Sequence, residues 1–419
     1  RDAFDFARDQ VEVRYPQVHL PLKERYERTF EHPAELLDPI LPPAPDSDWS
    51  RTYVYSNAQL FALASQTGAP VWDEPAPCRA QPELLVATPR RVALATRHEV
   101  FGLDAETGRR VWSWGRYPAD LAEPGADPEW FVTLYAHAYD AGRLFCIQDD
   151  GKAACLDIET GKVHWEHALV YRPTSPPVVF DRWLVFQGSA ARGRRVYCVL
   201  NTESGELIRT IDPGAESHPI RLHVTLDDKL IAVLSRSVQA YDLTTGRLLW
   251  QVKRDENITD STIQFDLDGI YLSDATEHVE KLSYDAGSLI WRSEPLIAHP
   301  ARNIRAFPEA GQVIYVSDRG LVAIDPVDGR TLWETSSPPE VTLRGWRRGR
   351  SIIAAIGTAP ERDGNTYTAF LYDHERGTLM GEDGIVELGA LGEVRRITLR
   401  DDAIVLQLDN HTISGWAAR

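Results

Sequence analysis

One short motif recurs eight times along this sequence of 419 residues. Most copies have a central glycine, an Asp or Asn four residues before it and a Trp four residues after it, as in YDLTTGRLLW around Gly246. The glycines of the eight copies are Gly68, Gly108, Gly161, Gly205, Gly246, Gly287, Gly329 and Gly377. Neighbouring copies lie 40 to 53 residues apart, a period typical of β-propellers and solenoids. The chain is therefore predicted to be a repeat protein.

The residues of one period read as four short strands. In residues 220–252 the apolar runs IRLHVTL, KLIAVLS and SVQAYDL follow one another, and the motif glycine precedes a fourth run, RLLWQV. Short apolar runs bounded by turn residues indicate strands, and no segment shows sustained helical periodicity. Four antiparallel strands in each repeat predict an all-β propeller with one four-stranded sheet per blade.

The motif itself has a physical explanation as the corner between the third and fourth strands. Glycine permits the left-handed conformation that reverses the chain. The carboxylate four residues earlier accepts hydrogen bonds from the exposed amides of the turn. The Trp is expected to lie flat against the next blade, with its indole N–H available for a hydrogen bond. We therefore interpret the repeated Trp as structural.

The repeat has the general form AxDxxTGxxxW and resembles the tryptophan-docking motif of the pyrroloquinoline-quinone-like propellers over residues 51–416. That superfamily contains the quinoprotein alcohol dehydrogenases and the non-enzymatic lipoprotein B of the outer-membrane barrel-assembly machine, and this chain is closest in character to the second. In individual copies Trp is replaced by Arg209 and Gly381, Asp by Ala64 and Ser283, and Thr by Ala286, Asp328 and Arg376. These departures concern the packing of single corners and leave the predicted architecture unchanged.

The number of repeats predicts eight blades. Seven full units occupy about residues 78–382, and an early unit that begins at Arg51 and a late unit that ends at Trp416 are expected to complete one blade together. Such a shared blade joins the two ends of the chain and removes exposed sheet edges. Residues 49–419 are thus assigned to the propeller. Residues 1–48 are expected to form an N-terminal extension, a partly helical arm, because Leu22, Tyr26 and Phe30 would share one helix face.

One hairpin places two of the four cysteines together. Asp150-Gly151 is a strong signal for a two-residue turn, which would pair Cys146 directly with Cys155. Such a pair lies at the lower limit of the distance for a disulfide. Two buried thiols on one face of the sheet are an equally good interpretation, and the sequence does not decide between them.

Charge and hydropathy exclude two classes of partner. The chain has 45 Lys and Arg against 62 Asp and Glu, a formal net charge of −17. A nucleic-acid binder needs a basic face, so no nucleic-acid partner is expected. No apolar run approaches the roughly 18 residues that a membrane-spanning helix requires, so no transmembrane segment is expected.

Known catalytic and metal-binding motifs are absent from the sequence. His164, Glu166 and His167 cannot converge on a metal, because on a strand the first two face one side and the third faces the other. The acidic segment from Asp266 to Gly269 lies where a turn between strands is expected, and turn chemistry explains it without calcium. We therefore expect no metal site and no catalytic residue that can be named.

The first strands of several blades carry basic side chains, although the chain is acidic overall. In a propeller these strands line the central channel, so their bases could form a positive funnel for a carboxylate or phosphate ligand. The candidate ligand-binding residues are His137, Arg221, His223, Arg302, Arg305, Arg344, Arg395 and the adjacent Arg396. The alternative is that these residues pair with nearby Asp and Glu, or lie in water at strand ends.

Three functional interpretations remain open. The first is a non-catalytic binding or scaffold propeller that uses one ring face and the central channel to hold a protein partner or an anionic ligand, with no cofactor. The second is a quinone-dependent dehydrogenase, although the adjacent cysteines of that family are missing here. The third is a small-molecule lyase or hydrolase that uses an Arg- and His-lined axial site, with His223 or His137 as acid or base. The family resemblance favours the first interpretation and an extracytoplasmic location.

Overall fold

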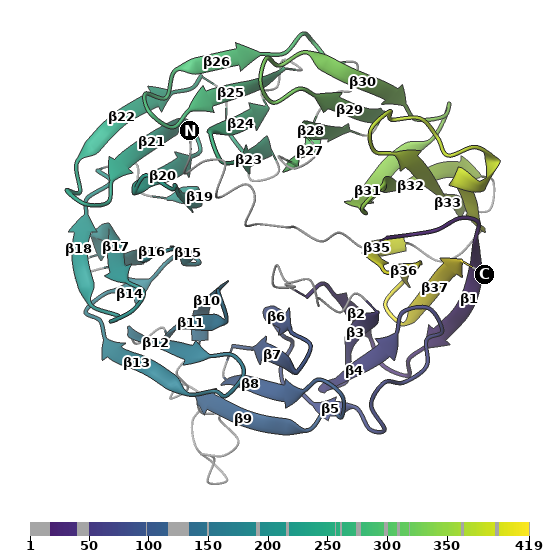
Figure 1. Ribbon diagram of the computed structural model, residues 1–419, viewed down its shortest axis with the longest axis horizontal. Coiled ribbons are helices and arrows are strands. Elements are labelled where there is room, and N and C mark those ends of the chain that lie inside the picture. The colour runs from purple at the N-terminus through teal and green to yellow at the C-terminus, as the bar shows by residue number, and fades with distance from the viewer. Residues whose placement is uncertain are drawn as a thin grey trace.

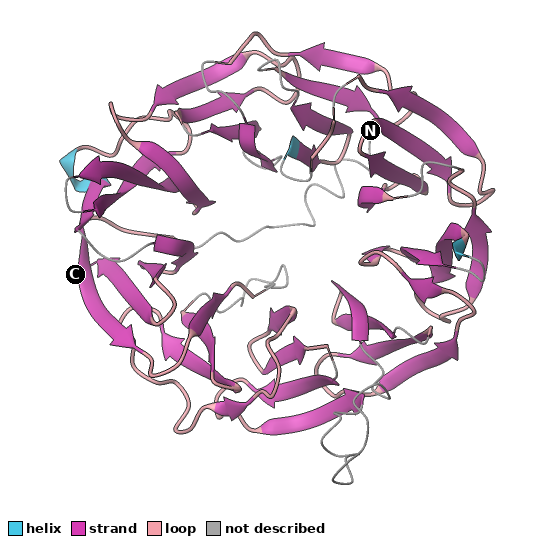
Figure 2. Cartoon of the chain, turned by 180° about the vertical axis from the view of Figure 1, so that it is seen from behind, coloured by secondary structure: helices cyan, strands magenta, loops and turns pink. Residues whose placement is uncertain are grey.

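Nine antiparallel sheets stand around a central channel in the computed structural model (Figure 1). The structure describes residues 17–39, 50–97, 99–115, 134–148, 151–189, 193–214, 218–255, 257–259, 262–273, 278–296, 301–307, 311–317, 319–361, 364–389 and 394–418. Figure 2 shows that strands make up nearly all of the regular structure. Within the described residues, no helix has the length and apolar character needed to cross a membrane.

Each blade runs from an innermost strand at the channel to an outermost strand at the rim. The first three blades contain β2 (Ala34–Leu37), β3 (Arg51–Ser56), β4 (Gln59–Ala64) and β5 (Ala76–Pro77); β6 (Leu84–Ala87), β7 (Arg91–Ala95), β8 (Glu99–Asp104) and β9 (Arg110–Gly115); and β10 (Leu134–Asp140), β11 (Arg143–Gln148), β12 (Lys152–Asp157) and β13 (Val163–Ala168). The fourth has five strands, because β14 (Arg172–Pro173) and β15 (Val178–Phe180) both pair with β16 (Trp183–Ser189), which is followed by β17 (Arg195–Asn201) and β18 (Leu207–Ile211).

The remaining blades follow the same order around the ring. The fifth to seventh contain β19 (Pro219–Val224), β20 (Lys229–Leu234), β21 (Ser237–Asp242) and β22 (Leu248–Lys253); β23 (Ile263–Phe265), β24 (Gly269–Ser273), β25 (Val279–Ser283) and β26 (Leu289–Arg292); and β27 (Ala301–Phe307), β28 (Gln312–Ser317), β29 (Gly320–Ile324) and β30 (Thr331–Ser336). The eighth contains β31 (Thr342–Arg348), β32 (Ile352–Glu361), β33 (Gly364–Asp373) and β34 (Ile385–Gly389), with the short 3-10 helix η6 (Glu382–Gly384) before β34.

The ninth blade joins the two ends of the chain. Its strands β35 (Val394–Arg400), β36 (Ala403–Leu408) and β37 (Thr412–Ala418) are completed at the rim by β1 (Leu22–Thr29), which pairs antiparallel with β37. The predicted closure by both chain ends is confirmed, but the predicted number of eight blades is wrong. The early unit is a complete blade because β2, from the segment assigned to the extension, supplies its innermost strand.

The helix predicted around Leu22, Tyr26 and Phe30 is also wrong. These residues lie in or directly after β1, in which a register shift occurs between Glu24 and Tyr26. Tyr26 occupies the place that Trp has in other blades, since its ring packs against Gly68 of the following blade and against Gly415. The four-residue spacing therefore reflects this packing on a bulged strand and not a helix.

The interblade contact predicted from the motif is confirmed. Each indole packs over the motif glycine of the next blade, where a Cβ built on Gly108 would lie only 2.6 Å from the ring of Trp72. In five of the six corners with a docked Trp, the indole N–H donates to a backbone carbonyl of that same corner. The Nε1-to-oxygen distances are 2.9 Å for Trp72 to Ala105, 3.2 Å for Trp112 to Ile158, 2.8 Å for Trp165 to Thr202, 2.9 Å for Trp250 to Tyr284 and 3.0 Å for Trp291 to Pro326.

The carboxylate of the motif stabilises the turn as predicted. Asp104 Oδ1 accepts hydrogen bonds from the backbone amides of Glu106 (3.1 Å) and Thr107 (2.9 Å) and from the Thr107 hydroxyl (2.9 Å). Gly108 has a φ of 71°, in the left-handed region. These hydrogen bonds lower the pKa of Asp104 below its ordinary value, although desolvation acts in the opposite direction.

At two corners that depart from the motif, the covering side chain has a buried N–H group without a hydrogen-bond acceptor among the residues that the structure describes. Arg209 replaces Trp and packs over Gly246, and its buried Nε has no hydrogen-bond partner within the described structure. Trp333 packs over Gly377, but its buried indole N–H is likewise without an acceptor in that part of the chain. The packing of the motif is therefore kept at both corners, while the hydrogen bond is lost.

The cysteine pairing predicted for the hairpin is wrong by one residue. Cys146 pairs with Ala154, and Cys155 pairs with Phe145, so the two thiols lie on opposite faces of the sheet. Asp149 and Asp150 lie outside the described residues, and Gly151 has a φ of 89°. Cys78, Cys146, Cys155 and Cys198 are all free and buried.

Two matched substitutions test the contribution of the indole hydrogen bond. Trp250→Phe and Trp333→Phe remove the same atoms from equivalent corners, but only Trp250 donates to a carbonyl. We expect Trp250→Phe to lower the free energy of unfolding by about 1–2 kcal/mol more than Trp333→Phe, because it leaves the Tyr284 carbonyl without its donor. Urea unfolding followed by circular dichroism measures the difference. An equal or larger loss for Trp333→Phe would contradict the proposed role of the hydrogen bond.

Candidate functional site

The basic residues predicted to line the channel all lie on innermost strands. His137 is on β10, Arg221 and His223 on β19, Arg302 and Arg305 on β27, Arg344 on β31, and Arg395 and Arg396 on β35. Figure 1 shows these strands around the central opening. The side chains of His137, Arg302, Arg305 and Arg344 are outside the described part, so these four are placed by their backbone alone.

A β-bulge brings three of the arginines to equivalent positions. The register shifts between Ala301 and Asn303 on β27, between Leu343 and Gly345 on β31, and between Val394 and Arg396 on β35. The extra residues at these bulges are Arg302, Arg344 and Arg395. Three successive blades therefore carry an arginine at the same place on the channel strand. The other two strands with this bulge, β10 and β19, have Tyr135 and Ile220 there.

The remaining bases are at other positions along their strands. Arg221 and Arg396 come one residue after the bulge, and His137 comes two residues after it. His223 and Arg305 come three residues after it. Three of the eight candidates are thus arginines at equivalent positions on successive strands, which we call the arginine arc. The other five lie at different distances from the bulge along their strands, so the eight do not form one ring.

His223 packs against aromatic rings of the next blade. It stacks on Phe265 with ring centroids 4.4 Å apart and an interplanar angle of 6°, and it lies 5.7 Å from the ring of Tyr284. Both rings come from the next blade. Burial lowers the pKa of His223 to about 4, so the ring is neutral at pH 7. Its neighbour Arg221 also contacts the next blade, donating from Nη1 to the Ile263 carbonyl at 3.2 Å.

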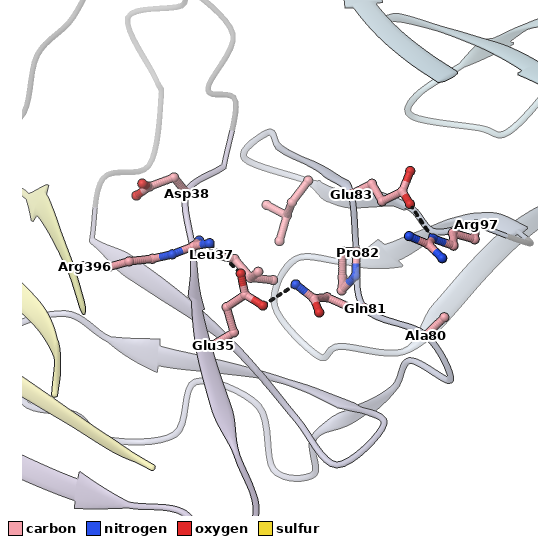
Figure 3. Close-up of a pocket in the computed structure, with 10 residues that line it drawn as sticks. Glu35, Leu37, Asp38, Ala80, Gln81, Pro82, Glu83, Arg97 and Arg396 are labelled. Carbon is pink, nitrogen blue, oxygen red and sulfur yellow. Dashed lines mark hydrogen bonds and ion pairs between the residues drawn. The ribbon is translucent and has the colours of Figure 1, made fainter. Parts of the chain in front are cut away.

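A cavity of about 780 Å³ opens where the innermost strands β2 and β6 face β35. Figure 3 shows that charged and amide side chains converge on it from several segments. The lining residues are Glu35, Leu37, Asp38, Ala80, Gln81, Pro82, Glu83, Leu85, Arg97 and Arg396. Of the predicted bases whose side chains the structure describes, Arg396 lines this cavity.

Ion pairs and hydrogen bonds cross the cavity wall. Arg396 Nη2 lies 2.6 Å from Glu35 Oε1, and Arg396 Nη1 donates to the Leu36 carbonyl at 2.9 Å. Gln81 donates from Nε2 to the other oxygen of Glu35 (Figure 3). On the opposite side Arg97 Nε lies 3.0 Å from Glu83 Oε1. Glu35 on β2 thus links Arg396 of the closing blade to Gln81 in the connection between β5 and β6.

Asp38 links the cavity to a buried arginine of the closing blade. Its carboxylate lies 2.9 Å from Arg347 Nη2 and 3.8 Å from Arg400 Nη2. Burial opposes ionisation of Asp38, but the positive charges of Arg347 and Arg400 outweigh it and lower the pKa of the carboxyl group. Arg400 is 2% exposed and also donates to the Arg51 carbonyl at 2.9 Å. The acid at the cavity therefore remains charged at neutral pH.

The chemistry of this cavity is that of a recognition site for polar groups. Guanidinium and carboxylate groups that pair with one another can exchange those partners for the carboxylates, amides or guanidinium groups of a ligand. Within the described residues, no group of three or more His, Cys, Asp or Glu side chains is arranged to hold a metal ion. The residues present do not fit a pyrroloquinoline quinone site of the resembling enzymes either, since no two cysteines are adjacent.

The acidic turn and the outer histidines have the roles expected from the sequence. Asp266 Oδ1 accepts from the amides of Asp268 (2.9 Å) and Gly269 (2.8 Å), as turn chemistry requires. Burial, with hydrogen bonding to Asp268, raises the pKa of Asp266 to about 6. His164 and His167 are exposed on the outermost strand β13.

Most of the cavity residues were not recognised from the sequence. Glu35 and Asp38 lie in the segment assigned to the N-terminal extension, and Gln81, Glu83 and Arg97 carry no motif. The available signal was the early unit, which needed an innermost strand from upstream to form a complete blade. The short apolar run around Leu36 supplies that strand.

A family model described as "Outer membrane protein assembly factor BamB" matches residues 37–233, 172–296 and 234–367. Together these ranges cover residues 37–367, which is well over half of the chain. The chain belongs to this family of PQQ-like β-propellers. The predicted family resemblance is thereby confirmed.

Individual relatives are distant. The chain is 24% identical over 250 residues to a 1-butanol dehydrogenase (cytochrome c) of Thauera butanivorans, a match over 57% of this chain and 31% of that protein. It thus spans about a third of the length of this curated relative. The crystal structure of the computationally designed Ika8 protein has a TM-score of 0.52 at 15% identity, covering 80% of this chain and 95% of the other. BamB from Moraxella catarrhalis has a TM-score of 0.44 at 16% identity, covering 95% and 100%.

The stacking of His223 leads to a prediction for the pH dependence of stability. An unfolded histidine takes up a proton below about pH 6.5, whereas the folded chain resists protonation until pH falls to about 4. Folding is therefore disfavoured progressively as pH drops between these values, by about 3 kcal/mol at pH 4. We expect His223→Phe, which keeps an aromatic ring between Phe265 and Tyr284, to remove this loss.

Urea unfolding of both proteins between pH 7 and pH 4 measures the effect. The stability of His223→Phe relative to the original chain should rise as pH falls, while Gln264→Ala on the neighbouring strand should show no such trend. If the difference between His223→Phe and the original chain is the same at pH 7 and pH 4, His223 is not buried in its neutral form.

Proposed function

We propose that this protein is a non-catalytic binding or scaffold propeller that holds an acidic protein partner or another anionic ligand at one end of its channel. The observation that supports this most strongly is the arc of Arg302, Arg344 and Arg395 at equivalent bulges of three successive channel strands. A bulge re-aims a side chain and recurs where a sheet meets a ligand. Arginine suits carboxylates, which accept paired hydrogen bonds, and three arginines here have equivalent backbone positions on their strands.

The neighbouring cavity supports the same proposal. Arg395 donates to Asn410 Oδ1, and the adjacent Arg396 reaches into the cavity, where it pairs with Glu35. The arc and the cavity therefore adjoin on β35. A partner with both acidic and basic groups could place its carboxylates at the arc and contact the alternating charges of the cavity. Family membership agrees with a role in protein binding.

A charge-matched pair of variants tests the proposal with octaglutamate as the probe. Replacing Arg302, Arg344 and Arg395 by Ser should weaken octaglutamate binding at least tenfold in fluorescence anisotropy, because the arc loses three positive charges. The control replaces Arg90, Arg109 and Arg330, which are exposed on turns and corners, and should change the affinity less than twofold. Equal losses in both variants would show general charge attraction and contradict a site at the channel.

The 1-butanol dehydrogenase match supports a second candidate, a quinone-dependent dehydrogenase. The test is to add pyrroloquinoline quinone and calcium to the purified protein, then measure the visible absorbance and butanol-dependent dye reduction. Since adjacent cysteines are missing, we expect neither signal at saturating quinone. An absorbance change together with dye reduction would replace the scaffold proposal by the enzymatic one.

A further inference from the structure

The outermost strands of three successive blades carry exposed aliphatic side chains at the same two positions. These pairs are Leu207 and Ile208 on β18, Leu248 and Leu249 on β22, and Leu289 and Ile290 on β26. Their side chains are 36% to 54% exposed. We call these six residues the aliphatic band. Single exposed aliphatic residues are ordinary on protein surfaces, but a contiguous set indicates an interaction site.

A β-bulge explains why two consecutive side chains are both exposed. On β21 the residues Ala240 and Tyr241 are neighbours, yet they pair with Trp250 and Leu248. Leu249 is therefore the extra residue, and the same shift makes Ile208 and Ile290 extra on their strands. The bulge turns the following Trp or Arg onto the next blade and leaves the two preceding residues at the rim.

The bulge itself does not require aliphatic residues. The same two positions hold Arg110 and Val111 on β9, Val163 and His164 on β13, and Thr331 and Leu332 on β30. Each of these blades has one polar residue in the pair and keeps both the bulge and the packing of its Trp. The doubly aliphatic pairs are confined to three adjacent blades, so the packing of the blade corners does not account for them.

The strands that carry the aliphatic band are basic, although the whole chain is acidic. None of the residues of β18, β22 and β26 is acidic, and these strands contain Arg209, Lys253 and Arg292, in a chain of net charge −17. Lys253 is exposed, and Arg292 is 43% exposed beside Glu280 at 3.6 Å. At the corners before these strands, the exposed Arg247 precedes β22 and the exposed Glu206 precedes β18, so the basic residues remain in excess. An acidic partner is therefore favoured electrostatically.

The shape of the rim restricts the kind of partner. The band covers three of nine blades, about a third of the circumference, and Figure 1 shows β18, β22 and β26 following one another around the convex outer edge. A flat membrane or the convex rim of a second copy would touch only part of such an arc. An extended polypeptide can follow it. Each of the three strands is also the last of its sheet, so its outer edge offers backbone hydrogen-bonding groups to such a segment.

We propose that the aliphatic band is a docking surface for an extended segment of a partner protein in which acidic and apolar side chains alternate. The apolar side chains would cover the exposed Leu and Ile pairs, and the acidic ones would meet Arg247, Lys253 and Arg292. This surface is on the outside of the ring. It is separate from the channel and goes beyond the function proposed above.

A synthetic peptide of alternating Glu and Val, ten residues long, serves as the probe in fluorescence anisotropy. The band variant carries Ile208→Ser, Leu249→Ser and Ile290→Ser. The control carries Val111→Ser, Val163→Ser and Leu332→Ser, which replace one exposed aliphatic residue of the corresponding pair on each of β9, β13 and β30 outside the band. We expect the band variant to bind at least tenfold more weakly and the control to differ less than twofold. A Lys and Val peptide should bind at least tenfold more weakly than the Glu and Val peptide.

Equal effects of the two variants, or equal binding of the two peptides, would overturn the proposal. It would also be overturned if the band variant lost only self-association in sedimentation, which identifies a second copy as the occupant, or only binding to phosphatidylglycerol vesicles, which identifies a membrane. The comparison is repeated in the channel variant that lacks Arg302, Arg344 and Arg395, where the added band substitutions should still weaken binding of the Glu and Val peptide at least tenfold. Failure of the band proposal is thereby distinguished from failure of the channel proposal.

Discussion

The stacking of one ring on one glycine between adjacent blades is the contact on which the whole ring depends. A methyl group at these glycines would collide with the indole, as the 2.6 Å approach at Gly108 and at Gly287 shows. The absence of a side chain therefore allows both the left-handed corner and the close contact. Tyr26 makes the same close contact with Gly68, whereas Arg209 covers Gly246 at a looser 3.5 Å, so groups other than an indole can cover the corner.

The same irregularity of the sheet shapes both candidate binding surfaces. At the channel, bulges on β27, β31 and β35 place an arginine at one level. At the rim, bulges on β18, β22 and β26 expose a second aliphatic residue before the docking side chain. The repeated blades keep the backbone constant, and the side chains at the bulges vary from blade to blade. In a repeat protein, side chains that differ between equivalent positions of the blades therefore indicate candidate binding surfaces.

Local sequence was sufficient to predict the repeat, the corner and the partner of each Trp, because these features are contained in one motif or in two adjacent ones. It was not sufficient for the number of blades. The strand β2 has only four residues, and nothing near it indicates that it pairs with β3. The helix expected at Tyr26 failed for a related reason, since β1 is defined by a strand nearly four hundred residues away.

The candidate site shows the same limit at the level of side chains. The bases on the channel strands were recognisable by their spacing, but their levels depend on bulges that have no sequence signal of their own. The sequence of one blade also gave no sign that His223 stacks with Phe265 and Tyr284 of the next blade. Cys146 and Cys155 separated because the hairpin has a register different from that of a two-residue turn. Each correction arises from a contact that a single repeat does not contain.

The seam in the ninth blade has a consequence for biosynthesis. The strand β1 pairs with β37, the final described strand, so β1 has no partner until all the residues between these two strands have been synthesised. Until then the ring of blades is open. The unpaired backbone groups of β37 and β1 can form hydrogen bonds with any other extended chain. Ring closure requires β1 to pair with β37, which lies nearly four hundred residues away, and contacts between such distant segments form slowly. Formation of the ninth blade is thus the folding step at which this protein is most prone to aggregate with other chains.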